Sequence, residues 1–201
     1  MSAVTWGCTA YRHACWTLVI GMSNQPSRVE ETGGWSKTST LLARRKSHQW
    51  VKRDQHWVMT APRAKYETEG DTTHEKTLDR AKRAAQYRAG NCGEHAAVVY
   101  AYLWEKARDK RIGLVSRVSC KKPGDHAFVV IGRDPFGDGS VNSWGPAAVV
   151  VDAWGRCVCD GLAVAGETGE YWEGEEEGIV RIQQYINHYD TRVICEFDTG
   201  A

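Results

Sequence analysis

Apolar residues are most frequent between Ala96 and Ala107, where they would cover most of the circumference of a helix. A helix that is apolar almost all round is buried on most sides. The pattern therefore predicts a central, buried helix over residues 93–110. A second helix is expected directly before it, from Thr72 to Gly90. Thr72 and Glu75 stand at capping-box spacing, and Gly90 suits a helix end that needs a positive φ.

Beyond residue 111 the pattern changes to short runs rich in valine and isoleucine, which is typical of strands. Five strands are predicted, over residues 114–119, 127–131, 147–152, 179–183 and 191–197. We expect residues 132–146 and the acidic, glycine-rich residues 161–178 to form loops. A buried helix followed by an antiparallel sheet indicates an α+β layer fold.

The first part of the chain has a weaker pattern. Residues 21–40 are rich in Gly, Ser, Thr and Asn and are expected to form a loop or linker, whereas residues 41–60 have loosely helical apolar spacing. We therefore divide the chain into an N-terminal extension, residues 1–70, and a main domain, residues 71–201. The extension is a delivery signal, a substrate-binding segment or part of the same fold.

Composition restricts the class of protein. The chain has 201 residues, 25% charged and 42% hydrophobic, which suits one globular domain with a core of its own. No apolar run approaches the roughly 18 residues that a membrane span needs, and the first 20 residues lack the pattern of a cleaved signal peptide. We therefore expect no membrane insertion.

Charge is unevenly distributed along the chain. Residues 1–111 carry 19 Lys and Arg against 11 Asp and Glu, a net charge of +8, whereas residues 112–201 carry −7. The two halves pair with each other or steer a charged partner. The basic residues are scattered rather than clustered in a motif, so nucleic acid is not an expected partner.

The seven cysteines are an odd number, so at least one has no partner within the chain. The chain is too long for a small disulfide scaffold, and most of the thiols are expected to be reduced and buried. Cys157-Val158-Cys159 lacks a second pair of ligands at zinc-site spacing, so no metal site is predicted.

One cysteine has a different setting. Cys92 lies between two glycines, in Gly90-Asn91-Cys92-Gly93, at the start of the predicted buried helix. The positive end of a helix dipole favours the thiolate, which is the nucleophilic form of cysteine. His126 begins one predicted strand and Asp152 ends another, so the two can meet in an antiparallel pair. A thiol, an imidazole and a carboxylate in this chain order predict a catalytic triad.

Other residues compete for supporting roles. Asn142, in Asn142-Ser143-Trp144-Gly145, is an alternative to Asp152 as the group that orients the histidine. Candidate donors to an oxyanion are the backbone N–H of Cys92 and the side chains of Asn91 and Gln86. His95 lies one helical turn after the thiol and is the alternative base.

The segments around these residues resemble the papain-like/transglutaminase-like superfamily of cysteine hydrolases, in particular its bacterial toxin and effector branch. The resemblance covers about residues 86–160. It rests on four segments, residues 90–96 (GNCGEHA), 125–133 (DHAFVVIGR), 144–146 (WGP) and 149–154 (VVVDAW). It implies a core in which the catalytic cysteine begins a buried helix packed on an antiparallel sheet. It also implies Cys92 as nucleophile, His126 as general base and acid, and Asp152 as the orienting carboxylate.

The resemblance also implies a function. We expect a secreted toxin or effector that deamidates a glutamine side chain of a target-cell protein through a thioester. A cysteine protease or a transamidase would use the same three residues, and an inactive relative, with nine tryptophans available for contacts, would be a binding module. Delivery by a specialised system into the target-cell cytoplasm, and a cognate immunity protein or chaperone, are the implied setting and partners. No metal or organic cofactor is required.

Overall fold

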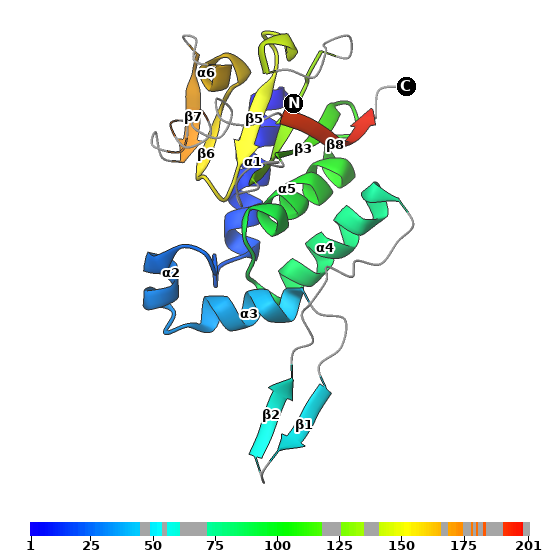
Figure 1. Cartoon of the computed structure of the whole chain (residues 1–201). Coiled ribbons are helices and arrows are strands. Elements are labelled where there is room, and N and C mark those ends of the chain that lie inside the picture. Colours follow the sequence, from blue (N-terminus) through cyan, green and yellow to red (C-terminus); the bar gives the residue numbers. More distant parts are fainter. Residues whose placement is uncertain are drawn as a thin grey trace.

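The structure is a computed structural model of the whole chain, shown in Figure 1. It describes the backbone of residues 1–44, 49–53, 56–60, 72–117, 126–134, 141–165, 169–174, 178, 180, 183 and 191–198. Within these residues, no helix has the length and apolar character needed to cross a membrane.

A six-stranded antiparallel sheet forms the centre of the molecule. Its strands, in spatial order, are β7 (Tyr171–Gly174), β6 (Cys157–Asp160), β5 (Val149–Asp152), β4 (His126–Ile131), β3 (Arg111–Arg117) and β8 (Thr191–Asp198). Every neighbouring pair runs antiparallel. Together with the helices that pack on this sheet, it confirms the predicted α+β class.

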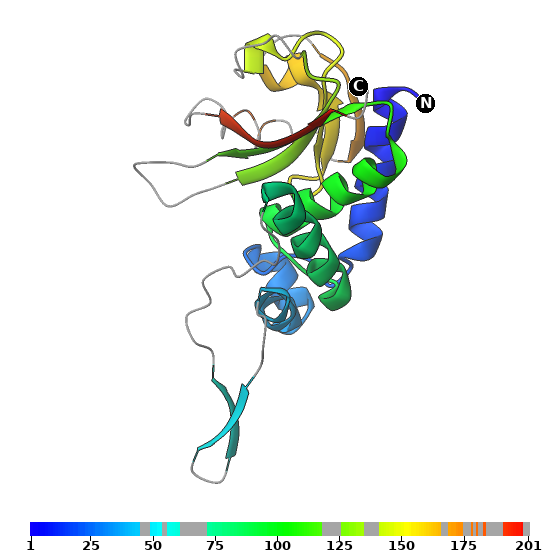
Figure 2. The ribbon, with the colours of Figure 1, turned by 90° about the vertical axis from the view of Figure 1, so that its right-hand side faces the viewer.

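Helices cover one face of the sheet. α5 (Cys92–Lys106) lies across β3, β4 and β5, and α1 (Ala3–Thr17) lies beside α5 and contacts β5 and β6 (Figures 1 and 2). Ala10 and Ala14 of α1 join Val99 and Leu103 of α5 in the larger hydrophobic core. Residues 3–17 therefore share the core of the segment that the sequence assigns to the main domain.

The opposite face of the sheet has a core of its own. Side chains alternate along β4, so that Val129 belongs to the helix-covered core and Phe128 and Val130 belong to the second core. A 3-10 turn, η1 (Val141–Ser143), and the short helix α6 (Gly161–Ala165) close this second core. The sheet is thus buried on both faces, which explains the nearly continuous apolar runs of β4 and β5.

The two helices predicted from the sequence are both present. α4 (Thr73–Tyr87) is capped by Thr72, whose hydroxyl accepts the Glu75 N–H at 3.1 Å while the Glu75 carboxylate accepts the Thr72 N–H at 3.0 Å. The predicted capping box is therefore confirmed. The predicted end at Gly90 is wrong, because the left-handed residue that ends α4 is Arg88, with φ of 55°.

Residues 21–40 are not a linker. They hold α2 (Pro26–Glu31) and most of α3 (Trp35–Ala43), separated by a turn that includes Gly33 and Gly34. Proline occupies the first turn of α2, where its fixed φ suits a helix and its missing N–H costs nothing. The linker was predicted from the glycine and serine content alone, without regard to the proline, which often begins a helix.

The helix expected within residues 41–60 is also wrong beyond Ala43. β1 (Gln49–Arg53) and β2 (His56–Thr60) pair antiparallel as a separate two-stranded sheet, which lies apart from the main sheet in both views (Figures 1 and 2). Aromatic and β-branched residues favour strands, and this composition outweighs the loose helical spacing.

The strands predicted after residue 111 are partly confirmed. β3 begins three residues before the predicted strand, while β5 and β8 lie close to the predicted positions. Residues 161–178 contain α6 and β7 rather than only a loop. The strand expected over residues 179–183 is wrong at the described positions, since Val180 and Gln183 have helical backbone.

Candidate active site

The thiol of Cys92 lies at the N-terminus of the buried helix. Cys92 is the first residue of α5, directly after the N-cap Asn91, and it is partly exposed. Residue 90, which precedes the N-cap, must be glycine, because a Cβ on Gly90 would lie 2.1 Å from the Cβ of Glu94. The Gly90 N–H donates to the Gly21 carbonyl oxygen at 3.2 Å. Contacts with the N-terminal segment thus hold the chain where it enters the helix.

His126 and Asp152 form a buried pair beside this thiol. Nε2 of His126 lies 2.6 Å from Oδ2 of Asp152, and the two side chains are only 2% and 1% exposed. His126 also hydrogen-bonds to the Cys92 side chain. The structure therefore brings the three residues expected to form a triad into one hydrogen-bonded row, thiol to imidazole to carboxylate.

The register of β4 and β5 accounts for the histidine–aspartate pair. Val129 lies opposite Val151 and Val130 opposite Val150. Continued by one step, this register sets Phe128 opposite Asp152. His126, two residues before Phe128, is then the diagonal neighbour of Asp152 on the same side of the sheet.

A turn after β5 fixes the carboxylate. The Gly155 N–H donates to Oδ1 of Asp152 at 2.8 Å, which leaves Oδ2 for the histidine. A Cβ on Gly155 would lie 2.4 Å from Oδ2, so a side chain here would displace the carboxylate. The turn thus holds both oxygens of Asp152 in place.

The surroundings of His126 favour its charged form. Burial, the strongest influence, lowers the pKa of His126, but the charge and hydrogen bond of Asp152 and those of Cys92 together outweigh it and raise the pKa to about 10. These contacts therefore favour the imidazolium over the neutral ring. A cation next to a thiol favours the thiolate. Because Asp152 occupies Nε2, Nδ1 is the nitrogen left to exchange a proton with the sulfur.

This shift predicts a pH dependence of stability. The pKa of His126 is higher in the folded protein than the value of about 6.5 in an unfolded chain. Folding therefore favours the protonated ring, and the stability gained is fully present below about pH 6.5 and is lost as the pH rises through about 10. We expect the thermal midpoint to fall between pH 7 and 10 more steeply in the wild type than in His126→Gln. Parallel curves would contradict the raised pKa.

An aromatic ring covers the histidine. The ring centroids of Trp154 and His126 lie 5.1 Å apart. The Trp154 indole N–H donates to Oδ1 of Asn24 at 3.0 Å, and the Gln25 side chain lies 3.5 Å from the Trp154 carbonyl oxygen. The loop between α1 and α2 therefore borders the site. Asn24 and Gln25 could not be predicted from the sequence, since no local pattern links them to a tryptophan about 130 residues away.

The same loop contacts the N-cap of α5. Oδ1 of Asn91 accepts hydrogen bonds from the Ser23 N–H at 2.9 Å and from the Ser23 hydroxyl at 3.0 Å. Asn91, a candidate oxyanion donor, is thus held by its own oxygen next to the thiol. The backbone N–H of Cys92 belongs to the first helical turn, whose N–H groups have no acceptor within the helix.

A buried ion pair supports this turn. Nε and Nη2 of Arg44 donate to the two carboxylate oxygens of Glu94 at 3.0 and 2.7 Å, and Glu94 also accepts the Asn91 N–H at 2.8 Å. Burial tends to raise the pKa of Glu94, but the hydrogen bond and charge of Arg44 outweigh it, and the pKa is lowered. The ion pair joins the end of α3 to the start of α5, and no local sequence pattern predicts it.

Removal of the arginine is expected to be costly. In Arg44→Met the carboxylate of Glu94, whose side chain is 2% exposed, loses its bidentate partner. Because Arg44 itself is partly exposed, we expect a loss of about 2–3 kcal/mol, below the range for a fully buried pair. Adding Glu94→Gln, which removes the charge and keeps an acceptor for the Asn91 N–H, should restore part of the lost free energy of unfolding. Denaturant unfolding measures both, and unchanged stability of Arg44→Met would contradict the expectation.

The remaining candidates lie in other settings. Gln86 is exposed near the end of α4, and Asn142 is exposed in η1, so it is Asp152 and not Asn142 that contacts the histidine. His95 is buried, and its Nδ1 donates to the Asn91 carbonyl oxygen at 3.0 Å. Burial, the largest influence, lowers the pKa of His95, which suits a neutral ring that braces the first turn of α5.

The other described cysteines lie in several settings. Cys157 and Cys159 are buried cysteines of β6 within the second core, Cys8 is partly buried, and Cys15 is exposed on α1. Cys120 and the side chain of Cys195 lie outside the described residues. In the described part of the chain, no group of three His, Cys, Asp or Glu side chains is placed to hold a metal ion.

Comparison of the chain with models of protein families, with curated proteins and with solved structures finds no match. The site combines a thiol at a helix N-terminus, an imidazole in hydrogen-bond contact with it, and a carboxylate bonded to that imidazole. Acyl transfer requires a nucleophile, a proton-transferring base and a group that orients the base, and these three side chains are of the kinds that supply them.

Proposed function

We propose that the protein is a cysteine hydrolase in which Cys92, His126 and Asp152 hydrolyse an amide through a thioester. The hydrogen-bonded row from the Cys92 thiol through His126 to Asp152 is the observation that carries the proposal. The position of Cys92 at the first turn of a buried helix supports it, because that position favours a thiolate. A papain-like or transglutaminase-like core is part of the proposal, supported by the arrangement of α5 on the antiparallel sheet.

The proposed reaction has two steps. The Cys92 sulfur attacks the amide carbon, and the backbone N–H of Cys92, in the first turn of α5, would donate to the resulting oxyanion. His126 gives its proton to the leaving nitrogen, so that ammonia departs and a thioester remains. Water then attacks the thioester and gives its proton to His126, and the C–S bond breaks, which releases the acid and restores the Cys92 thiolate beside the imidazolium. Asp152 keeps the imidazole oriented and stabilises its positive charge throughout.

The side-chain carboxamide of a protein glutamine is the substrate we favour. Its support is the resemblance of the segments around Cys92, His126 and Asp152 to the toxin and effector branch of cysteine hydrolases. The same resemblance supports delivery into a target cell, where the protein would convert glutamine to glutamate. A producer that is itself susceptible would need an immunity protein.

The test compares the wild type with Cys92→Ala after incubation with lysate of a candidate target cell. Peptide mass spectrometry follows two signals, conversion of glutamine to glutamate and new chain termini. Conversion with the wild type alone supports the deamidase and identifies its target. New termini with the wild type alone would replace the deamidase by a protease. Identical spectra for the two proteins would contradict a hydrolase acting on that proteome.

A further inference from the structure

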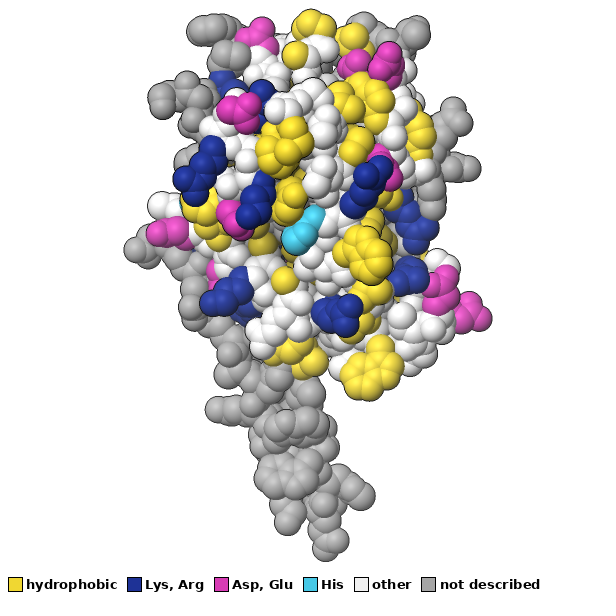
Figure 3. Space-filling model, turned by 180° about the vertical axis from the view of Figure 1, so that it is seen from behind, with side chains coloured by type: hydrophobic (Ala, Val, Ile, Leu, Met, Phe, Trp, Pro, Cys, Tyr) yellow, Lys and Arg dark blue, Asp and Glu magenta, His cyan; other side chains and the backbone are white. Residues whose placement is uncertain are grey.

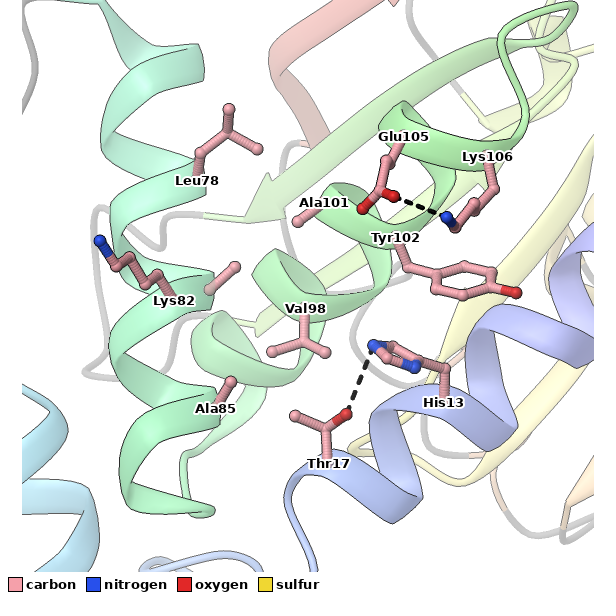
Figure 4. Close-up of a pocket in the computed structure, with 11 residues that line it drawn as sticks. His13, Thr17, Leu78, Lys82, Ala85, Val98, Ala101, Tyr102, Glu105 and Lys106 are labelled. Atoms are coloured by element: carbon pink, nitrogen blue, oxygen red, sulfur yellow. Dashed lines mark hydrogen bonds and ion pairs between the residues drawn. The ribbon is translucent and has the colours of Figure 1, made fainter.

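A groove lies on the helical side of the molecule, away from the thiol. It has a volume of about 360 Å³ and lies between α1, α4 and α5 (Figure 4). Its apolar lining comes mainly from α4 and α5. The residues are Leu78, Ala81, Ala85, Val98, Ala101 and Tyr102.

The small residues of this lining set its shape. Ala81 and Ala85 are one helical turn apart on α4, and Ala101 faces the groove from α5. Alanines at such positions allow a third helix to approach two packed helices closely. On the far side, His13 of α1 stacks on Tyr102 with ring centroids 4.5 Å apart, which gives the groove a firm aromatic wall.

The rim of the groove is charged. Lys82 and Lys106 line it together with Glu105, which forms an ion pair with Lys106 at 2.6 Å, so that Lys82 leaves these three side chains with a net positive charge. α4 and its C-cap residue together carry five Lys and Arg against two acidic residues. Seen from behind, Lys and Arg side chains surround hydrophobic ones on this side of the molecule (Figure 3). Such a surface attracts an acidic partner.

Two large apolar side chains near the end of α1 are exposed. Trp16, which precedes Thr17 of the groove lining, is 80% exposed, and Val19, two residues beyond the helix, is 45% exposed.

We propose that this groove binds an amphipathic helix of a partner protein, which places apolar side chains on the alanine-lined floor and acidic side chains beside Lys82 and Lys106. Helix-in-groove recognition needs an apolar channel flanked by charges complementary to those of the ligand, and both are present here. Ala101 lies nine residues after Cys92 on α5, about 14 Å along the helix axis. Cys92 does not line the groove, and binding of a helix there does not depend on the proposed hydrolase activity.

The experiment uses the full chain carrying Cys92→Ala, so that catalysis plays no part. The probes are dye-labelled synthetic peptides of about 20 residues, long enough to form a helix. One has a leucine face flanked by glutamates, one replaces the glutamates by lysines, and one is the acidic peptide with a proline at its centre. Fluorescence anisotropy gives the dissociation constants, and circular dichroism confirms that each variant is folded.

The acidic helix is expected to bind at least about tenfold more tightly than the other two peptides. Lys82→Glu combined with Lys106→Glu should weaken it by about tenfold or more, and Ala85→Trp should block it by filling the groove. Lys37→Glu, a matched reversal of an exposed lysine on α3, should leave binding unchanged.

Three results would overturn the proposal. One is equal binding of the acidic and basic peptides, and another is binding that survives both groove variants. The third is a dimer of the protein alone that Ala85→Trp dissociates, since the occupant would then be a second copy of this chain. Loss of glutamine deamidation in lysate with retained peptide binding would overturn only the proposed hydrolase.

Discussion

Replacement of Cys92 by alanine is expected to lower the rate of substrate conversion by ~10⁴-fold or more. Without the sulfur no thioester can form, and His126 and Asp152 have no nucleophile to activate. The substitution removes one atom at a partly exposed position, so the fold should be retained. The rate of glutamine conversion in the target peptide, followed by mass spectrometry, measures the effect.

Cys15→Ala is the matched control for this prediction. It removes another thiol, exposed on α1 and outside the hydrogen-bonded row, and should leave the rate unchanged. A Cys92→Ala protein that converts substrate within about tenfold of the wild-type rate would show that the chemistry does not use this thiol.

Asp152→Asn is expected to cost ~10³–10⁴-fold in turnover. The amide can still accept the Gly155 N–H, so the turn after β5 should keep its geometry. It carries no charge, however, so the imidazolium of His126 loses its main support, and the pKa of His126 should fall. The activity profile with pH should therefore change in shape as well as in height, which a purely structural role of Asp152 would not produce.

Asp160→Asn provides the comparison. Asp160 also ends a strand, β6, and its carboxylate accepts the Leu162 N–H at 2.8 Å. It has no place in the triad, so its variant should retain wild-type turnover and pH profile. Equal losses in Asp152→Asn and Asp160→Asn would point to a general effect of strand-end aspartates on stability.

The parts of the fold predicted well from the sequence carry strong local signals. The capping box at Thr72 and the apolar stretch after Cys92 define α4 and α5 without help from distant residues. Valine-rich runs identify β4 and β5 because both strands are buried on two faces. The chain order of Cys92, His126 and Asp152 predicts a triad, and the register of two adjacent strands explains why His126 and Asp152 meet.

The parts missed depend on contacts between distant segments. The loop between α1 and α2 borders the site because it hydrogen-bonds to Asn91 and Trp154. Arg44 supports the site because it binds Glu94, 50 residues further on. None of these partners can be recognised from neighbouring residues. The N-terminal segment looked separate for the same reason, although Ala10 and Ala14 of α1 lie in the main core.

These contacts give the N-terminal segment a structural part in the candidate site. Ser23 holds Asn91 at the start of α5, Asn24 holds Trp154 over His126, and Arg44 neutralises Glu94. The proposed catalytic geometry thus depends on residues from both halves of the chain.

Alkylation of Cys92 tests the central claim most directly, because it needs no substrate. The protein is treated briefly with iodoacetamide at pH 7, and peptide mass spectrometry compares the modification of Cys92 with that of exposed Cys15. An imidazolium beside the sulfur predicts that Cys92 reacts more than about tenfold faster in the wild type than in His126→Ala, whereas Cys15, whose pKa is raised by burial, should react equally in both proteins. Equal rates of Cys92 alkylation in the wild type and in His126→Ala would contradict an activated thiol at this site.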